Sequence, residues 1–367
     1  MRAYILIALI AALVTAASTF LVLKLAHKYK IYPAIRARDV HTKPTPRLGG
    51  IALMIGFVVS MGAAALFGWF HSVFVDPSKV ITIVVCAVAI TLLGFFDDLY
   101  DLDWTLKLAG QFLVAGLLAW QGVQIVSLPI AGLTIGSFGT SLVVTVFITV
   151  LVMNAVNFID GLDGLVAGVV LIGTLVFFAY AYLLTQQNSP TDYFNLATLI
   201  SAAVIGVCVG FLPFNWRPAK IFMGDGGALL LGLLMSTSAL TVTGQIDPQL
   251  TTMTDAVPAF LPLILPLAIL VLPLLDFTLA VLRRLRAGKS PFAADRKHIH
   301  HRLQDFGHSH LGSVLVFYVW TAVISISTML FFFWPANQVA FFFWPSALMA
   351  LVYTIWPILS HHPQVQD

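Results

Sequence analysis

The chain has 367 residues, of which 59% are hydrophobic and 10% are charged, with a formal charge of +3 and a mean hydropathy of +0.96. Soluble domains carry about a quarter charged residues, so this composition excludes a soluble globular protein. It indicates an all-α polytopic membrane protein without a nucleic-acid partner. The two cysteines, Cys86 and Cys208, lie in apolar runs, as is typical of small buried side chains.

Apolar runs near the length of a bilayer crossing predict about eleven transmembrane helices. The first run is too long for a typical signal-peptide core and more runs follow it, so we expect it to be a span. The runs fall at about 4–25, 49–70, 80–96, 106–121, 141–159, 165–185, 195–214, 227–243, 257–282, 311–333 and 339–359.

Basic residues gather on one side of these predicted helices. Of the 19 Lys and Arg residues, 17 follow spans one, seven and nine or open span four, and only Arg2 and Lys79 lie opposite. The positive-inside rule makes the basic side cytoplasmic, which places the N-terminus outside and the C-terminus in the cytoplasm. We expect a single domain, 1–367, with cytoplasmic loops at about 26–48, 97–105, 160–164, 215–226 and 283–310.

Four polar clusters interrupt the apolar runs, and alternating spans place all of them on the cytoplasmic side. Carboxylates next to hydrocarbon are costly and usually mark function. The clusters are Asp97-Asp98-x-x-Asp101, Asn154-x-x-Asn157-x-x-Asp160-x-x-Asp163, Met223-Gly-Asp225-Gly-Gly227 and His298-x-His300-His301.

In the first cluster, the adjacent carboxylates of Asp97 and Asp98 repel, so a positive group must offset them. Mg²⁺ is the usual candidate. Lys107 and Gln111, one turn apart in the next span, could reach the same space. A solvated helix end is an equally good reading of these Asp residues taken alone.

The second cluster repeats every three residues, and each such step drifts about 60° around a helix, so its first three members share a broad face. The amides of Asn154 and Asn157 could hold Asp160 or contact a polar ligand. The alternative is polar contact between helices, although two carboxylates exceed what such contacts need.

Asp225 opens the eighth span and could simply cap its helix. A glycine-flanked helix start is also a natural anion site, however, and the nearby Arg217 suits phosphate. Asp276 lies inside the ninth run, two turns before Arg283 and Arg284, where a structural ion pair and a direct role are equally consistent.

The three His residues of the fourth cluster lie among Arg and Lys. No Cys is nearby and the spacing does not match two zinc ligands on a helix. Imidazoles in a basic segment fit phosphate binding better than cation binding.

Together, from about residue 36 to 310, these motifs resemble the polyprenyl-phosphate N-acetylhexosamine-1-phosphate transferase family. The form of the His motif is similar to the WecA/TagO branch rather than to MraY. The carrying residues are Gly94-Phe-Phe-Asp97-Asp98, Asn154-x-x-Asn157-Phe-Ile-Asp160-Gly-Leu-Asp163, Phe222-Met-Gly-Asp225, Asp295-Arg-Lys-His298-Ile-His300-His301 and Thr45-Pro-Arg-Leu-Gly-Gly50.

The resemblance implies a Mg²⁺-dependent site, with Mn²⁺ as an alternative, on the cytoplasmic face of a bacterial plasma (inner) membrane. The implied donor is a UDP-N-acetylhexosamine and the acceptor is polyprenyl phosphate. The expected products are UMP and a polyprenyl-diphospho-sugar, with GlcNAc as the expected sugar, in the first membrane step of a cell-envelope polysaccharide. A homodimer stays open, and the alternative function is a nucleotide-sugar transporter.

The same resemblance assigns catalytic roles to Asp97 and Asp98, and metal binding to Asp225, to which we add Asp98. The residues expected to bind substrate are Asn154, Asn157, Asp160, Asp163, Lys107, Lys43, Arg217, His298, His300 and His301.

Overall fold

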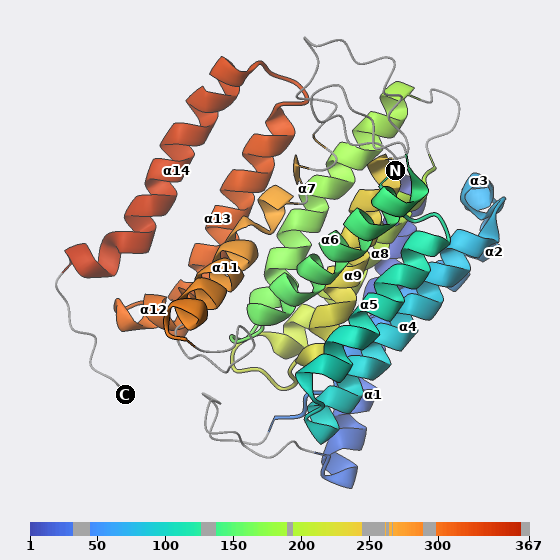
Figure 1. The fold of residues 1–367 in the computed structure, drawn as a ribbon, viewed down its shortest axis with the longest axis horizontal. Coiled ribbons are helices and arrows are strands. Elements are labelled where there is room, and N and C mark those ends of the chain that lie inside the picture. The colour runs from blue at the N-terminus through green and yellow to red at the C-terminus, as the bar shows by residue number, and fades with distance from the viewer. Residues whose placement is uncertain are drawn as a thin grey trace.

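The computed structural model describes residues 1–31, 45–125, 137–188, 194–243, 261, 264–265, 267–288 and 299–360, with the side chains of residues 188, 243, 300 and 359 outside the description. These residues form helices and no strand (Figure 1), which confirms the all-α prediction. The helices are α1 Arg2–Tyr29, α2 Gly49–Leu66, a 3₁₀ turn Gly68–Phe70, α3 His71–Phe74, α4 Pro77–Tyr100, α5 Trp104–Trp120, α6 Phe138–Phe158, α7 Leu165–Asn188, α8 Leu196–Asn215, α9 Gly224–Thr243, α11 Val271–Arg286, α12 Ile299–Asp305, α13 His310–Leu330 and α14 Ala336–Leu359.

Nine helices in the described part of the chain are long and apolar enough to cross a membrane, and α5 is a shorter apolar helix of 17 residues. The prediction of a multi-pass membrane protein is therefore confirmed. The ninth predicted run, 257–282, lies partly outside the described residues, and α11 covers only its second half. The count of eleven and the orientation in the membrane stay predictions.

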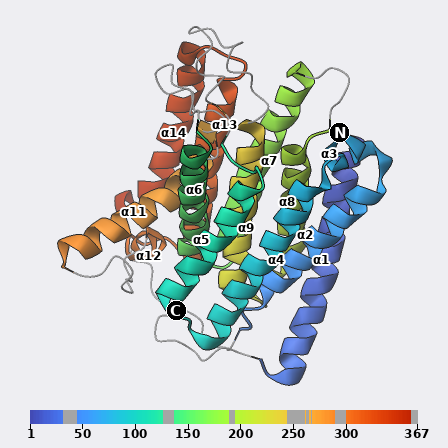
Figure 2. The same ribbon diagram turned by 45° about the vertical axis from the view of Figure 1, so that its right-hand side comes forward.

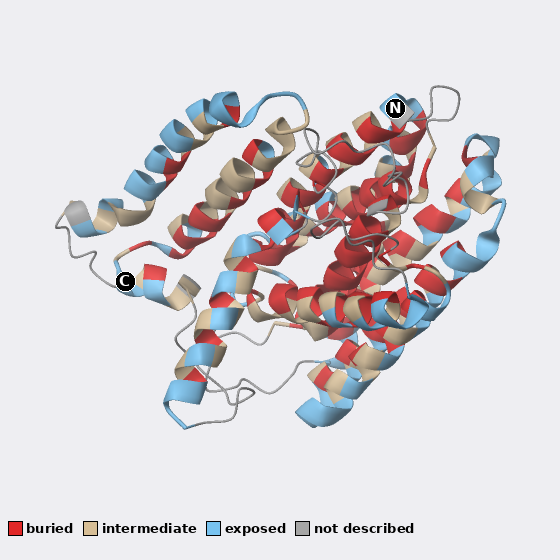
Figure 3. Ribbon diagram, turned by 45° about the horizontal axis from the view of Figure 1, so that its top comes forward, coloured by how far each residue is buried: buried red, intermediate tan, exposed pale blue. Residues whose placement is uncertain are grey.

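Helix α9 lies at the centre of the bundle, and α2, α4, α6 and α8 pack against it. Of its apolar window, 89% is buried, against 17% for α14 at the periphery. Figure 3 shows the same gradient as a red centre within paler outer helices. In Figure 2, α1, α2 and α4 lie on one side of the bundle and α13 and α14 on the other. The start of α9 is thus enclosed by other helices.

The ends of α4 and α5 are fixed by short polar residues. Asp76 caps α4 by accepting the Ser78 N–H at 3.1 Å, and Asp103 caps α5 by accepting the Thr105 N–H at 2.8 Å. Asp101 ends α4 in the left-handed conformation, with φ of 54°, which Asp tolerates better than most residues. The predicted loop 97–105 is therefore only residues 101–103, and Asp97 and Asp98 are helical.

Two glycines allow α4 to approach the start of α9 closely. A Cβ atom at Gly94 of α4 would lie 2.3 Å from the Gly226 nitrogen and 2.6 Å from the Asp225 carbonyl carbon. The neighbour in both cases is backbone, which cannot move aside without shifting the helix. The absence of a side chain at Gly94 therefore sets how near the α4 carboxylates lie to Asp225.

We expect Gly94→Ala to separate α4 from α9, lowering the stability by about 1–3 kcal/mol and reducing activity with it. The melting temperature of the detergent-solubilised protein measures the effect. Gly62→Ala is the matched control, because a Cβ there meets nothing within 4 Å and Ala is the better helix former. Equal melting temperatures for the two variants would contradict the close-packing argument.

Candidate active site

The polar residues meet at one end of the bundle, which we call the acidic end and define by Asp97, Asp98, Asp160 and Asp225. Helices α4 and α6 end there and α9 begins there, at the end of the bundle opposite the N-terminus (Figure 1). The starts of α1 and α4 lie at the other end. Side chains from α4, α5, α6 and α9 thus converge although they lie up to 128 positions apart in the sequence.

Lys107 of α5 joins α4 to α9. Its ammonium donates to Asp97 Oδ2 at 2.9 Å and also to Asp225 Oδ2. Asp97 is 9% exposed, and its other oxygen accepts the Leu102 N–H at 3.0 Å. Two carboxylates that would repel each other are therefore held together by one cation between them.

The remaining oxygen of Asp225 is held by α6, since Asn157 Nδ2 donates to Asp225 Oδ1 at 3.0 Å. Asp98 contacts the same residue through the main chain, with its Oδ2 accepting the Asp225 N–H at 2.9 Å. Gly224 makes this contact fit: its φ is 69°, and a Cβ would lie 2.4 Å from Asp98 Oδ2. The start of α9 is thereby tied to both α4 and α6.

Asp160 lies half-buried in the turn between α6 and α7. Burial, followed by the negative charge of Asp225, raises the pKa of Asp160 to about 7, and the positive charge of Arg47 opposes this. Arg47 is therefore near enough to act on the acidic end. Sequence reasoning placed Arg47 only in a matching motif and not among the site residues.

The segment that carries Arg47 is fixed on the chain before α9 by main-chain hydrogen bonds. Phe222 N–H donates to the Pro46 carbonyl at 2.9 Å, and the Gly49 and Gly50 N–H groups donate to the carbonyls of Phe222 and Met223 at 3.0 and 2.9 Å. The Gly49-Gly50 pair was the sequence signal for this close approach, because a side chain at Gly50 would collide with the Gly227 nitrogen.

Asp163 and Asn154 make structural contacts. Asp163 is buried and its Oδ2 accepts the Ala219 N–H at 3.1 Å, which joins the α6–α7 turn to the α8–α9 loop. Asn154 donates to Gln111 of α5 and to the Val150 carbonyl. For Asn154, the alternative of polar contact between helices thus describes the observed geometry.

Asn215 is a second residue that sequence reasoning missed. It is buried at the end of α8, accepts the Gly164 N–H at 3.0 Å and donates to the Ile221 carbonyl at 3.0 Å. A polar residue ending an apolar span was the available signal. Its two contacts hold the turn that carries Asp163 next to the segment leading into α9.

The other predicted substrate-binding residues are placed in part. Arg217 is exposed in the α8–α9 loop. Lys43 and His298 lie outside the described residues, as does the side chain of His300, while the half-buried His301 lies in α12. Figure 1 places α12 toward the same end of the bundle as the acidic end.

No group of three or more His, Cys, Asp or Glu side chains forms a complete metal site within the described ranges. Mg²⁺, however, commonly binds through one or two carboxylates, with waters and substrate phosphates as its other ligands. The acidic end brings four carboxylates together against the two cations Lys107 and Arg47. Asp98 and Asp225 therefore fit a partial site for a hard divalent cation.

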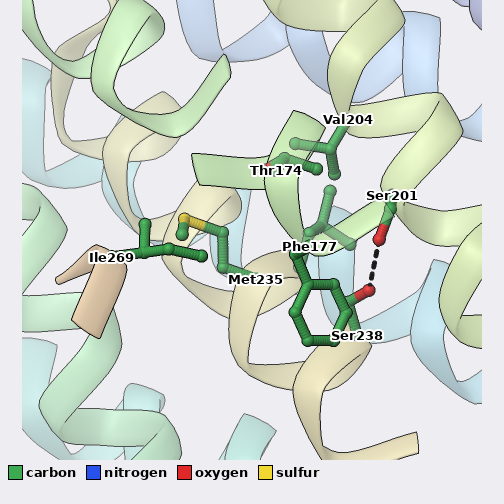
Figure 4. A pocket seen from close by; sticks show the side chains of 8 residues that line it. Thr174, Phe177, Ser201, Val204, Met235, Ser238 and Ile269 are labelled. Carbon is green, nitrogen blue, oxygen red and sulfur yellow. Dashed lines mark hydrogen bonds between the residues drawn. The ribbon is translucent and has the colours of Figure 1, made fainter. Parts of the chain in front are cut away.

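A small cavity between α7, α8 and α9 is separate from the acidic end. Its walls include Phe177, Val204 and Met235, and the hydroxyls of Ser201 and Ser238 hydrogen-bond across it at 2.7 Å (Figure 4). The described residues that line this cavity carry no charge. This part of the wall therefore lacks the charged groups that favour a nucleotide or a phosphate.

Comparison with known proteins agrees with this site. The family model described as glycosyl transferase family 4 matches residues 80–243, which include all four carboxylates of the acidic end. The decaprenyl-phosphate N-acetylglucosaminephosphotransferase of Mycolicibacterium smegmatis is 36% identical over 369 residues, covering 99% of this chain and 90% of that protein.

Two further relatives match a smaller share of the chain. A probable undecaprenyl-phosphate N-acetylglucosaminyl 1-phosphate transferase of Bacillus subtilis is 36% identical over 297 residues, covering 80% of this chain and 75% of that protein. A phospho-N-acetylmuramoyl-pentapeptide-transferase of Halalkalibacterium halodurans is 36% identical over 218 residues, covering 55% of this chain and 62% of that protein. With a relative of this identity along almost its whole length, the chain belongs to glycosyl transferase family 4.

Proposed function

We propose that the protein transfers N-acetylglucosamine-1-phosphate from UDP-N-acetylglucosamine to polyprenyl phosphate, giving polyprenyl-diphospho-N-acetylglucosamine and UMP. The observation that carries the proposal is the convergence of Asp97, Asp98 and Asp225 about Lys107 at one end of an apolar bundle. The names of the relatives support the same kind of acceptor and the same transferred N-acetylglucosamine phosphate. The length of the polyprenyl chain differs between those names and stays unassigned.

We assign the acidic end to the cytoplasmic face of a bacterial inner membrane. The support is the distribution of basic residues, 17 of 19 of which share the predicted side of the acidic end. At the cytoplasmic face, a lipid phosphate at the membrane surface and a water-soluble nucleotide could both reach the same carboxylates. A homodimer remains a prediction.

In the proposed reaction, an oxygen of the lipid phosphate attacks the β-phosphorus of the donor. A new P–O bond forms as the bond from the β-phosphorus to the bridging oxygen breaks, and UMP leaves with that electron pair. The protein has little covalent chemistry to perform in such a transfer, so positioning and charge stabilisation dominate. We assign Asp97 and Asp98 to catalysis, next to the acceptor phosphate.

Asp98 and Asp225 are the residues that would hold Mg²⁺ or Mn²⁺. When bound, the ion supplies charge neutralisation to the donor diphosphate. When all four carboxylates are ionised, Lys107 and Arg47 offset only part of their charge, and a divalent cation would offset the remainder. The positive charge of Lys107 offsets the repulsion between Asp97 and Asp225. The positive charge of Arg47 offsets the negative charge near Asp160.

We assign Asn157, Asp160 and His301 to direct binding of the donor. Asp163 supports the turn between α6 and α7. Arg217, together with Lys43, His298 and His300, completes the predicted set. The polar groups gather at one end of the bundle, whereas transport sites lie near the bilayer midplane. This placement favours a transferase over the nucleotide-sugar transporter.

The proposal is tested by UMP release from UDP-N-acetylglucosamine with purified protein, polyprenyl phosphate and Mg²⁺. Asp98→Asn and Asp225→Asn should each lower the rate by about 100-fold or more, because each removes charge next to the transferred phosphate. Asp76→Asn, at the opposite end of α4, is the control and should retain the rate. Full activity of Asp98→Asn would remove Asp98 from the mechanism.

Lys107→Met should lower the rate of UMP release by about 100-fold or more, since the two carboxylates it joins then repel each other. Lys79→Met removes a basic side chain near the other end of α4 and should leave the rate unchanged. If the two variants are equally active, Lys107 does not organise the site.

Asp160 gives a pH dependence of stability. Its pKa in the folded protein, about 7, lies above the ordinary value of 3.8. The stability linked to this carboxyl is therefore fully present below pH 3.8 and is lost as the pH rises through about 7. Without divalent cation, the melting temperature should decline between pH 5 and pH 8, and Asp160→Asn should reduce this decline. Asp305→Asn serves as the control, and an unchanged decline in Asp160→Asn would exclude this source.

A further inference from the structure

Asp276 is a fully buried carboxyl in α11, a helix that carries none of the four carboxylates of the acidic end. Its Oδ1 accepts the main-chain N–H of Ile299 at 2.8 Å, from a residue 23 positions later. A buried carboxyl in an apolar segment is costly unless hydrogen bonds compensate it. The position therefore requires an explanation beyond packing, and the contact with Ile299 provides one.

Ile299 is the first residue of α12, the short helix that carries His300 and His301. The first N–H groups of a helix have no partner within the helix. Asp276 satisfies one of them from a different helix, and a hydrogen bond to a carboxyl oxygen is among the stronger ones. The contact thus fixes the start of the His-bearing helix against α11.

The next residue of α11, Phe277, contacts the end of α6. Phe277 packs edge-on against Phe158, with ring centroids 5.0 Å apart, and the Arg284 guanidinium lies 5.6 Å from the centre of the same Phe158 ring. Phe158 ends α6, directly after Asn157 and two residues before Asp160. One helix therefore contacts both the start of α12 and the end of α6, next to the turn assigned to the donor.

We propose that Asp276 is a positioning residue, which acts through the Ile299 N–H to hold the His300–His301 segment at a fixed place relative to the α6 end. The inference rests on the proposed function, in which both segments bind the UDP-sugar. Asp276 itself does not touch the reacting atoms. It holds the main chain of this segment in place when the donor diphosphate binds.

The first test separates donor binding from acceptor binding. Asp276→Ala should raise the KM for UDP-N-acetylglucosamine by about ten- to a hundredfold, the range for losing a hydrogen bond to a charged group. The KM for polyprenyl phosphate should stay unchanged. Asp276→Asn keeps an acceptor oxygen and should lie between the wild type and Asp276→Ala, which keeps the test available if the alanine variant does not fold. Thr278→Ala, on α11 with its hydroxyl donating to the Leu274 carbonyl, is the matched control.

The second test needs no transferase activity. If Asp276 holds α12, tryptic cleavage after the exposed Arg302 should be faster in Asp276→Ala than in the wild type or Thr278→Ala, with Asp276→Asn between them. Unchanged cleavage overturns the anchoring role. Faster cleavage with an unchanged donor KM overturns its link to donor binding. If the wild-type protein releases no UMP, the proposed function is overturned. The proteolysis result then still tests whether Asp276 anchors α12.

Discussion

The contact of Lys107 with Asp97 and Asp225 is the interaction on which the rest of the site depends. Carboxylates at the end of apolar helices repel each other and lose hydration, so they can be assembled only where opposite charge and hydrogen bonds compensate them. The ammonium of α5 supplies that charge between α4 and α9. The amide of Asn157 adds the fourth helix. Without this network, repulsion between the carboxylates would oppose the convergence of the four helix ends.

Close packing of the helices allows the groups of this network to contact each other. The ammonium can contact two carboxylates only because α4 lies against the start of α9, where Gly94 faces the Gly226 main chain. On the other side, Gly49 and Gly50 let the segment with Arg47 pair with Phe222 and Met223. Small residues allow helices in a bilayer to approach closely, and here they serve the geometry of charged groups as well as packing.

Much of this arrangement could be predicted from the sequence, because hydropathy locates apolar helices and their alternation places loops on one side. That logic placed the polar clusters together but gave no distances between them. It could not show that Asn154 donates to Gln111 while Asn157 donates to Asp225, since the two Asn residues lie on one helix face. It also missed Arg47, whose position depends on main-chain pairing of segments distant in sequence, and Asn215, whose side-chain amide bonds to main-chain groups of two loops. Loop pairing of that kind has no periodic signal.

The bond from the Asp225 N–H to Asp98 changes the meaning of the glycine-flanked start of α9. A bare helix N-terminus attracts phosphate through free N–H groups. Here one of those groups is already bound to an internal carboxylate, so the chain provides its own competitor for an incoming anion. A phosphate that approaches this helix end meets negative charge first and gains the N–H only when that charge has been neutralised or displaced. Under the proposed function, the helix start would therefore favour anions that arrive together with positive charge.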